Sequence, residues 1–152
     1  MKIIPFFLFF YSSTFAATFS IISPCEDKPA LIHEYQMTNE SNVGDQTVKI
    51  LTHLNIPFHG TAQGISSIQG SPTGTESIEV INNNHMNAYG WCYSVNGFEH
   101  GQYPNEFKVT NQDHILWWYG FATYKAGNWI TQCTPSADRR DSQFCKNLNQ
   151  DL

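Results

Sequence analysis

The sequence predicts a small β-rich domain stapled by disulfides, and three observations support this fold class. Short runs of alternating apolar and polar residues are separated by turn-forming residues, as in strands joined by hairpins. Asn96-Gly97 marks the clearest turn, because both residues accept the positive φ of a tight hairpin. The four cysteines are an even number, which predicts two bridges in an exported chain. With 152 residues and a net charge of -5, the chain has the size of one domain.

The first 16 residues have the form of a secretory signal peptide. Met1 and Lys2 form a positive start, Ile3–Phe10 is almost wholly apolar, and small residues at Ala16 and Ala17 suit cleavage. The apolar run is shorter than the roughly 20 residues that a membrane span needs. We therefore predict a secreted or periplasmic protein without a membrane span. An uncleaved anchor or a buried strand is the alternative.

The rest of the chain divides into three predicted parts. Residues 17–46 are polar and interrupted by prolines, which predicts an extended N-terminal lead-in with one strand near Ala30–Met37. Residues 47–133 form the domain itself. Residues 134–152 form a polar C-terminal tail, with one short helix held by Cys145.

The first half of the predicted domain has the weaker signals. Thr47–Leu54 is predicted as a strand, because Val48 and Ile50 recur with period two. Gly60–Gly74 contains four glycines and a proline, which predicts a loop. Ser77–Asn82 alternates as a strand does, and a short helix capped by Thr73 with Glu76 is the alternative.

The last third of the chain has the stronger signals. Ile115–Tyr119 is a continuous apolar run, as in a central strand covered on both faces. Lys125–Asn128 joins two of the strands as a turn. The predicted strands of this region are Gly90–Val95, Glu106–Thr110, Ile115–Tyr119, Phe121–Tyr124 and Trp129–Cys133.

The positions of the cysteines favour one disulfide pattern among the three that four cysteines allow. Cys92 and Cys133 lie in apolar, strand-like runs, whereas Cys25 and Cys145 lie in the polar terminal segments. We therefore expect the bridges Cys92–Cys133 and Cys25–Cys145. A zinc site is the competing interpretation, but the sequence contains no C-x-x-C and no Cys/His pair at ligand spacing.

Charge and motifs argue against several functions. Charged residues make up only 14% of the chain, and the balance is acidic, which argues against a general nucleic-acid binder. The sequence contains no G-x-S-x-G elbow and no histidine pair at i, i+4. We therefore expect no enzyme activity, no catalytic residues, no bound metal and no required cofactor. A glycan-degrading enzyme would instead bring Glu99 or Glu106 close to Asp113 in a groove.

Aromatic residues, 14% of the chain, gather in one stretch. Twelve of them lie between Tyr89 and Trp129. Neighbouring strand residues point to opposite faces, so Trp117 and Tyr119 share one face and Trp118 with Leu116 the other. If one face is core, the second exposes indole to a ligand. The alternative is that all of them are core. The candidate ligand-binding residues are Trp91, Tyr93, Trp117, Trp118, Tyr119, Tyr124 and Trp129, with Trp118, Tyr124 and Trp129 as the strongest.

Two segments resemble a known family. Residues 90–97 read G-W-C-Y-S-V-N-G and residues 113–120 read D-H-I-L-W-W-Y-G, with Tyr103 and Phe107 in the linker. This pattern resembles the DUF4430 family, secreted bacterial domains related to the C-terminal β domain of transcobalamin and intrinsic factor, over about residues 47–133. The resemblance implies a β-rich α+β, β-grasp-like mixed sheet with a short helical crossover. It also implies cobalamin as a candidate ligand, for which the vertebrate domain acts as a cap.

Together these patterns predict an exported, non-enzymatic binding module. Its partner is a small molecule, either cobalamin or another ring-bearing ligand, held on an aromatic sheet face. The alternative is a protein-interaction module, such as a periplasmic inhibitor or a host-directed secreted effector.

Overall fold

A computed structural model describes residues 16–148, so the predicted signal peptide lies outside the described residues except for Ala16. No helix in this range is long and apolar enough to cross a membrane. The elements follow the chain as β1 (Ala17–Ile22), β2 (Pro29–Tyr35), β3 (Ser41–Asn42), α1 (Val43–His53), β4 (Phe58–Thr61), β5 (Gly64–Ile68), η1 (Gly74–Ser77), β6 (Ile78–Asn82), β7 (His85–Val95), β8 (Phe98–Glu99), β9 (Lys108–Val109), β10 (His114–Lys125), β11 (Asn128–Pro135), η2 (Ser136–Arg139) and α2 (Gln143–Leu148).

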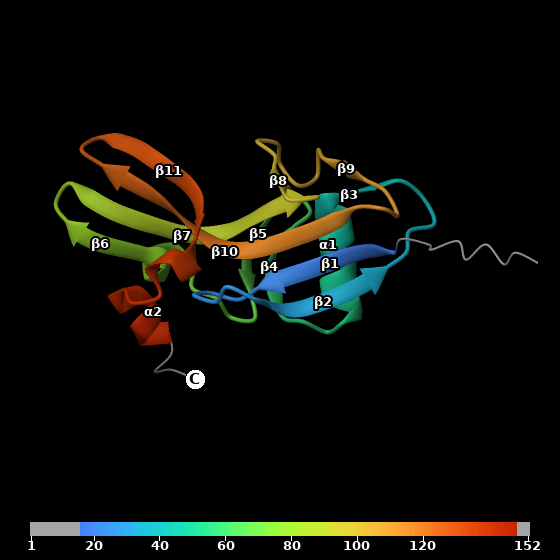
Figure 1. Cartoon of the computed structure of the whole chain (residues 1–152), viewed down its shortest axis with the longest axis horizontal. Coiled ribbons are helices and arrows are strands. Elements are labelled where there is room, and N and C mark those ends of the chain that lie inside the picture. Colours follow the sequence, from blue (N-terminus) through green and yellow to red (C-terminus); the bar gives the residue numbers. More distant parts are fainter. Residues whose placement is uncertain (1–15, 149–152) are drawn as a thin grey trace, which may run out of the picture.

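Two long antiparallel strands, β7 and β10, form the centre of a mixed sheet (Figure 1). Two strands pair with the edge of β10 that faces away from β7. Strand β1 pairs in parallel with the first half of β10, and β11 pairs antiparallel with the second half. On the outer edge of β7, β8 pairs near one end and β6 near the other. Within residues 16–148 the sheet has seven strands, ordered β2-β1-β10-β7-β6, with β11 on β10 and β8 on β7. The β-rich, mixed-sheet part of the prediction is therefore confirmed.

The half of the sheet that carries β6 and β11 extends to the left in Figure 1. We call this half the wing: β6, β11 and the parts of β7 and β10 that pair with them. The other half, with β1 and β2, packs against α1. The two halves have separate hydrophobic clusters, one containing Trp117 and the other containing Tyr119 and Phe144.

The strand predicted over Thr47–Leu54 is wrong, because this segment lies in helix α1. The Asn42 side chain accepts a hydrogen bond from the Asp45 N–H at 2.7 Å, which caps the helix. Val43, Thr47 and Leu51 are buried at helical spacing. The period-two pattern of Val48 and Ile50 was therefore coincidental, and the Asn42 cap was the missed signal.

The extended lead-in predicted for residues 17–46 contains more structure than expected. Strand β1 lies inside the sheet between β2 and β10, and Phe19 and Ile21 are completely or almost completely buried. The alternation of these two residues with Thr18 and Ser20 is a strand signal that the polar surroundings obscured. Strand β2 matches the strand expected near Ala30–Met37, and α1 runs across the predicted boundary at residue 46.

The loop predicted over Gly60–Gly74 is also wrong in part, because the end of β4 and the whole of β5, which form a separate hairpin, lie in this region. Ile65, Ser67 and Ile68 of β5 are buried, and both isoleucines join the core beside α1. Four glycines made the segment look irregular. One of them, Gly60, has a φ of 135° at the register shift in β4, which few other residues adopt.

The strands predicted for the last third of the chain are present, but their lengths differ: β7 begins at His85 rather than Gly90, and β11 extends one residue before and two residues beyond the predicted Trp129–Cys133. Asn96 and Gly97 have φ values of 54° and 80°, as a type I′ turn requires. The strands predicted over Ile115–Tyr119 and Phe121–Tyr124 are one continuous strand, β10. The strand predicted over Glu106–Thr110 is only the two-residue β9, which pairs with β3. The predicted Ser77–Asn82 strand is β6, and the tail forms α2.

Both predicted disulfides are confirmed. Cys25–Cys145 links segments 120 residues apart, and Cys92–Cys133 links segments 41 residues apart. The first bridge holds the C-terminal segment against the wing, where the Phe144 ring stacks on Tyr89 with centroids 3.8 Å apart.

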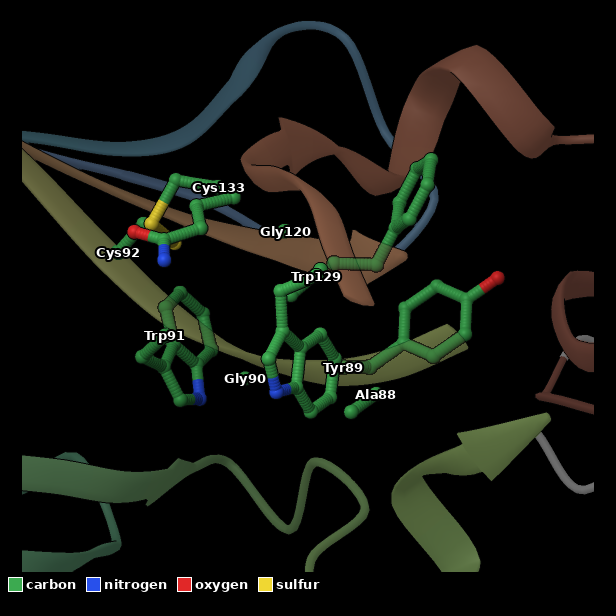
Figure 2. A pocket seen from close by; sticks show the side chains of 11 residues that line it. Ala88, Tyr89, Gly90, Trp91, Cys92, Gly120, Trp129 and Cys133 are labelled. Carbon is green, nitrogen blue, oxygen red and sulfur yellow. A yellow bond between two sulfur atoms is a disulfide. The ribbon is translucent and has the colours of Figure 1, made fainter. Parts of the chain in front are cut away.

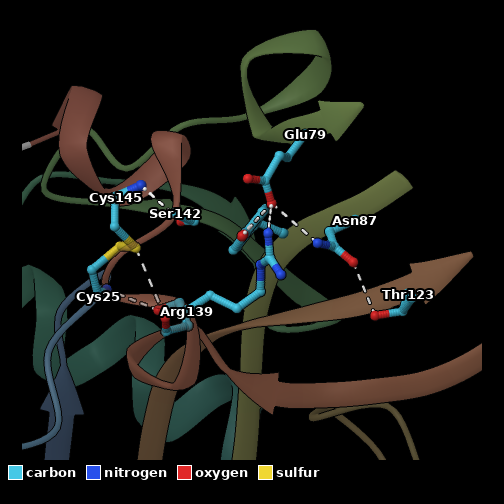
Figure 3. A network of polar contacts seen from close by, with 9 residues as sticks. Cys25, Glu79, Asn87, Thr123, Arg139, Ser142 and Cys145 are labelled. Atoms are coloured by element: carbon cyan, nitrogen blue, oxygen red, sulfur yellow. Dashed lines mark hydrogen bonds and ion pairs between the residues drawn. A yellow bond between two sulfur atoms is a disulfide. The ribbon is translucent and has the colours of Figure 1, made fainter. Parts of the chain in front are cut away.

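A partly buried polar network holds the same segment in place (Figure 3). One carboxylate oxygen of Glu79 accepts hydrogen bonds from Asn87, Tyr89 and Arg139 at 2.9–3.0 Å. Asn87 in turn accepts a bond from the Thr123 hydroxyl at 2.9 Å. Phe144 and Arg139 therefore cover part of this face of the wing.

Candidate functional site

Residues of β7 and β10 alternate between a covered and an open face. Odd-numbered side chains, such as Tyr93 and Trp117, point into the clusters under α1 and α2. Even-numbered residues point to the other face, where some, such as Ala88 and Ala122, are partly exposed. We call this second surface the open face.

Strand β11 crosses part of the open face. Cys92 and Cys133 lie on β7 and β11, the strands on either side of β10. In a flat sheet their Cα atoms would be two strand spacings apart, about 9.6 Å. The observed Cα–Cα distance is only 5.8 Å. The register of β11 shifts twice, and Cys133 has a φ of 53°. The end of β11 therefore folds over β10, where the Cys133 carbonyl accepts a 2.9 Å bond from the Trp118 indole N–H.

Gly120 is the residue that allows this crossing. A Cβ placed there would lie 3.0 Å from the Thr134 carbonyl oxygen and 3.1 Å from the Trp118 indole nitrogen. The neighbouring backbone belongs to Cys133 and Thr134, and the Cys92–Cys133 disulfide restrains its movement away from Gly120.

Gly120→Ala is expected to lower the free energy of unfolding by about 1–3 kcal/mol, because it overpacks this crossing. Denaturant unfolding followed by tryptophan fluorescence measures the change. A midpoint equal to that of the wild type would show that β11 moves aside at no cost and that the crossing is loosely held.

Beyond the crossing, four small residues form a platform on the open face. Gly90 pairs with Gly120 and Ala88 pairs with Ala122 across β7 and β10. The groove above them, which we call the platform groove, has a volume of about 350 Å³. Its other lining residues include Trp129, Gln132 and the Cys92–Cys133 bridge, and none of its lining residues is charged.

Trp129 forms one wall of the platform groove. Figure 2 shows its indole extending from β11 toward Gly90 and Ala88 of β7, and all three residues line the groove. The indole is 51% exposed and contacts the Tyr124 ring edge-on, with centroids 5.4 Å apart. An exposed aromatic ring beside a flat floor of glycine and alanine residues leaves space for another flat ring.

The apolar surface continues from the groove across the wing. Val80, Met86, Tyr124 and Trp129 are register partners on four neighbouring strands, so they form one row on the open face. Val80 is 70% exposed. The row contains no charged residue and extends the apolar surface beyond the groove.

The predicted site residues divide between the two faces. Trp117 and Tyr119 are 1% exposed and Tyr93 is 9% exposed, so these three belong to the core. Trp91 is half-buried on the covered face, and its indole N–H donates to the Ser71 hydroxyl at 2.8 Å. Tyr124 and Trp129 lie on the open face as expected.

Trp118 was expected to be exposed, and this expectation is wrong. It lies on the open face but is only 6% exposed, because the end of β11 covers it. The aromatic side chains that the open face leaves accessible are therefore Tyr124 and Trp129 at the wing.

Sequence reasoning missed the platform residues. Ala88 and Gly90 alternate along β7, and Gly120 and Ala122 alternate along β10, so small residues recur with period two in both strands. This is the signal that a search for aromatic residues overlooked. Their cross-strand pairing could not be read from the sequence, because it depends on the register of β7 with β10.

Two of the candidate tyrosines, Tyr93 and Tyr119, have raised pKa values. Burial raises the pKa of Tyr119, and the nearby Tyr89 raises it further. Burial and then the charge of Glu106 raise the pKa of Tyr93. Both phenols are therefore neutral at physiological pH. Glu99, Glu106 and Asp113, the carboxylates that a glycan-degrading enzyme would bring together, do not line the platform groove.

Comparison with known proteins gives little further information. No family model and no curated protein matches the chain. A solved structure from Ruminococcus gnavus ATCC 29149, described as a "putative metal binding protein", is similar to this chain with a TM-score of 0.46 and 11% identity. The similarity covers 68% of this chain and 94% of that chain. Among residues 16–148 of this chain, no three His, Cys, Asp or Glu residues are grouped to hold a metal ion.

Proposed function

We propose that this chain is an exported, non-enzymatic binding module that holds a flat, ring-bearing ligand in the platform groove. The observation that carries the proposal is the exposed Trp129 indole beside the paired small residues Gly90–Gly120 and Ala88–Ala122. A groove of about 350 Å³ is at the small end for ligand sites, so it suits one ring system of a larger ligand. The uncharged lining favours a neutral ring.

Cobalamin is the first ligand to test, because the motifs of residues 90–97 and 113–120 resemble the transcobalamin β domain. The topology supports a β-grasp-like assignment. A β1–β2 hairpin and helix α1 precede β7 and β10, and β10 lies parallel to β1 in the order β2-β1-β10-β7. A cap of this kind covers one side of its ligand, which is consistent with an open and shallow groove.

Trp129→Ala is expected to weaken binding about tenfold or more, because stacking on an indole contributes roughly 1 kcal/mol beyond the buried area. Titration of the mature protein with cobalamin, followed by tryptophan fluorescence and visible absorbance, measures this affinity.

Ile130→Ala is the matched control for this titration. Ile130 is the next residue of β11 and is similarly exposed, at 57%, but it does not line the groove. Equal losses in the two variants would show that binding does not depend on the platform groove. No spectral change at high micromolar cobalamin would remove this ligand from the proposal.

A protein-interaction module is the second candidate function. The row of Val80, Met86, Tyr124 and Trp129 favours it, because an uncharged apolar row four strands wide extends beyond the groove. A stoichiometric protein partner recovered without any small-molecule binding would support this function over the first.

A further inference from the structure

A second cavity, of about 460 Å³, lies beside β7 and outside the platform groove. Its lining includes Gly64 and Ile65 of β5, residues 91–93 of β7, Glu99 of β8 and residues 100–104 of the loop that follows β8. We call it the loop cavity. Its volume lies within the range that small-molecule sites have in proteins. The loop cavity is therefore large enough to hold a ligand of its own.

Aromatic side chains form one part of this lining. Tyr103 is 62% exposed, so its ring is accessible from solvent. Trp91 is half-buried, and the 2.8 Å hydrogen bond from its indole N–H to the Ser71 hydroxyl holds the indole in place. Tyr93 and Trp117 also line the cavity but are buried. A ligand with a flat apolar face packs well against rings of this kind.

Polar side chains that the fold itself does not use line the same cavity. Within residues 16–148, Gln63 and Gln102 form hydrogen bonds only through backbone atoms, and Glu99 takes part in no ion pair. All three side chains are exposed at the cavity. The two amides can each donate and accept, and the carboxylate accepts. The loop cavity thus offers donors and acceptors to a ligand that brings its own hydroxyl groups.

The charge of the lining argues against an anionic ligand. Among the described residues that line the loop cavity, Glu99 is the single carboxylate and none is Lys or Arg. A phosphate or carboxylate group would therefore meet a like charge without a compensating lysine or arginine. A neutral polyhydroxylated ligand instead donates to Glu99, and hydrogen bonds to an ionised acceptor are stronger than those between neutral groups.

Hydrogen bonds hold the loop of the cavity in place without a ligand. The Tyr93 hydroxyl donates to the Gln102 carbonyl at 2.8 Å, which ties the loop to β7. The Gly44 N–H donates to the Pro104 carbonyl at 2.9 Å, which ties the loop to the start of α1. A site that is already formed loses little conformational entropy when its ligand binds.

We propose that the loop cavity binds a neutral sugar, with one or two pyranose rings of a glycan inside it. A pyranose ring has apolar C–H faces and a rim of hydroxyl groups. The C–H face packs against the aromatic part of the lining, which includes Tyr103. The hydroxyl groups donate to Glu99 and exchange hydrogen bonds with the amides of Gln63 and Gln102. This site goes beyond the proposed function, because it takes a second class of ligand at a different place.

An NMR titration of the mature, disulfide-bonded protein tests the proposal. The probes are the neutral disaccharides cellobiose, lactose, mannobiose and N,N′-diacetylchitobiose, each added to about 20 mM, which detects dissociation constants in the millimolar range. At least one of them is expected to shift the Trp91 indole N–H signal saturably. The Trp129 signal is expected to stay unchanged, because Trp129 lines the platform groove but not the loop cavity.

Variants of exposed residues then locate the sugar. Tyr103→Ala removes an aromatic part of the lining and is expected to weaken binding of that disaccharide about tenfold. Glu99→Gln keeps the shape of the side chain but removes its charge, and is expected to weaken binding at least about fivefold. Phe98→Ala is the matched control, because Phe98 is a similarly exposed aromatic residue on β8, at 70%, that does not line the loop cavity. It is expected to leave the affinity unchanged.

The proposal is overturned if none of the disaccharides shifts the Trp91 signal, or if they shift Trp129 alone. It is also overturned if folded Tyr103→Ala or Glu99→Gln binds as well as the wild type, or if Phe98→Ala loses as much affinity as Tyr103→Ala. The loop cavity and the platform groove share only Trp91 and the Cys92–Cys133 bridge. Failure of the sugar titration therefore leaves the ring-binding proposal standing, and failure of the cobalamin titration leaves the sugar site standing.

Discussion

Replacing Cys25 and Cys145 together by serine lowers the free energy of unfolding by roughly 2–5 kcal/mol, the largest effect expected of any disulfide change in this chain. The bridge closes a loop of 120 residues, and a cross-link over a longer loop removes more entropy from the unfolded chain. It also fixes the segment from which Phe144 stacks on Tyr89 and Arg139 pairs with Glu79 at 2.9 Å.

The Cys92–Cys133 bridge is the internal comparison. It closes a loop of 41 residues, so its removal is expected to cost about 1 kcal/mol less in unfolded-state entropy. Denaturant unfolding of the two double-serine variants gives both values. A larger loss for the Cys92/Cys133 variant would contradict this ranking and would mean that the β11 crossing contributes more than the C-terminal segment.

Trp117→Ala is expected to lower the free energy of unfolding by about 3–5 kcal/mol, as for other large aromatic residues removed from a core. The Trp117 side chain is 1% exposed and packs between the sheet and α1. Its indole N–H donates to the Thr47 hydroxyl at 2.9 Å, so the variant also leaves that buried hydroxyl without its donor.

Trp129→Ala is the matched control, because it removes the same side chain from a site that is 51% exposed. Its expected cost is below about 1 kcal/mol. Urea unfolding of both variants measures the difference. Similar costs for the two variants would contradict the assignment of Trp117 to the core and Trp129 to the surface.

How much the sequence predicted depends on the kind of signal. The Asn96-Gly97 turn and the alternation around Trp91 and Tyr93 are local, and they predicted the hairpin and the faces of β7 correctly. The same reasoning failed at Thr47–Leu54, where β-branched residues imitate a strand. There the helix cap at Asn42 outweighs them.

The candidate site was less predictable than the fold. Trp118 and Trp129 have the same chemistry in the sequence, and the crossing of β11 alone decides that one is buried and the other exposed. The crossing depends on the register shifts between β10 and β11 and on the absence of a side chain at Gly120. Neither the register nor the close approach to Gly120 can be read from the sequence. The platform depends on pairing as well, because Gly90 and Gly120 meet only across the sheet.

Gly90→Val tests the central claim, that the platform groove holds the ligand, most directly. A Cβ at Gly90 meets no atom within 4 Å, so valine fits the strand and its side chain occupies the groove. We predict an unfolding free energy within about 0.5 kcal/mol of the wild type and an affinity for cobalamin at least about tenfold lower. The measurement is an NMR titration that follows the Trp129 indole N–H in both proteins. Equal affinity in the folded variant, or a Trp129 signal that cobalamin leaves unchanged in the wild type, would contradict the account.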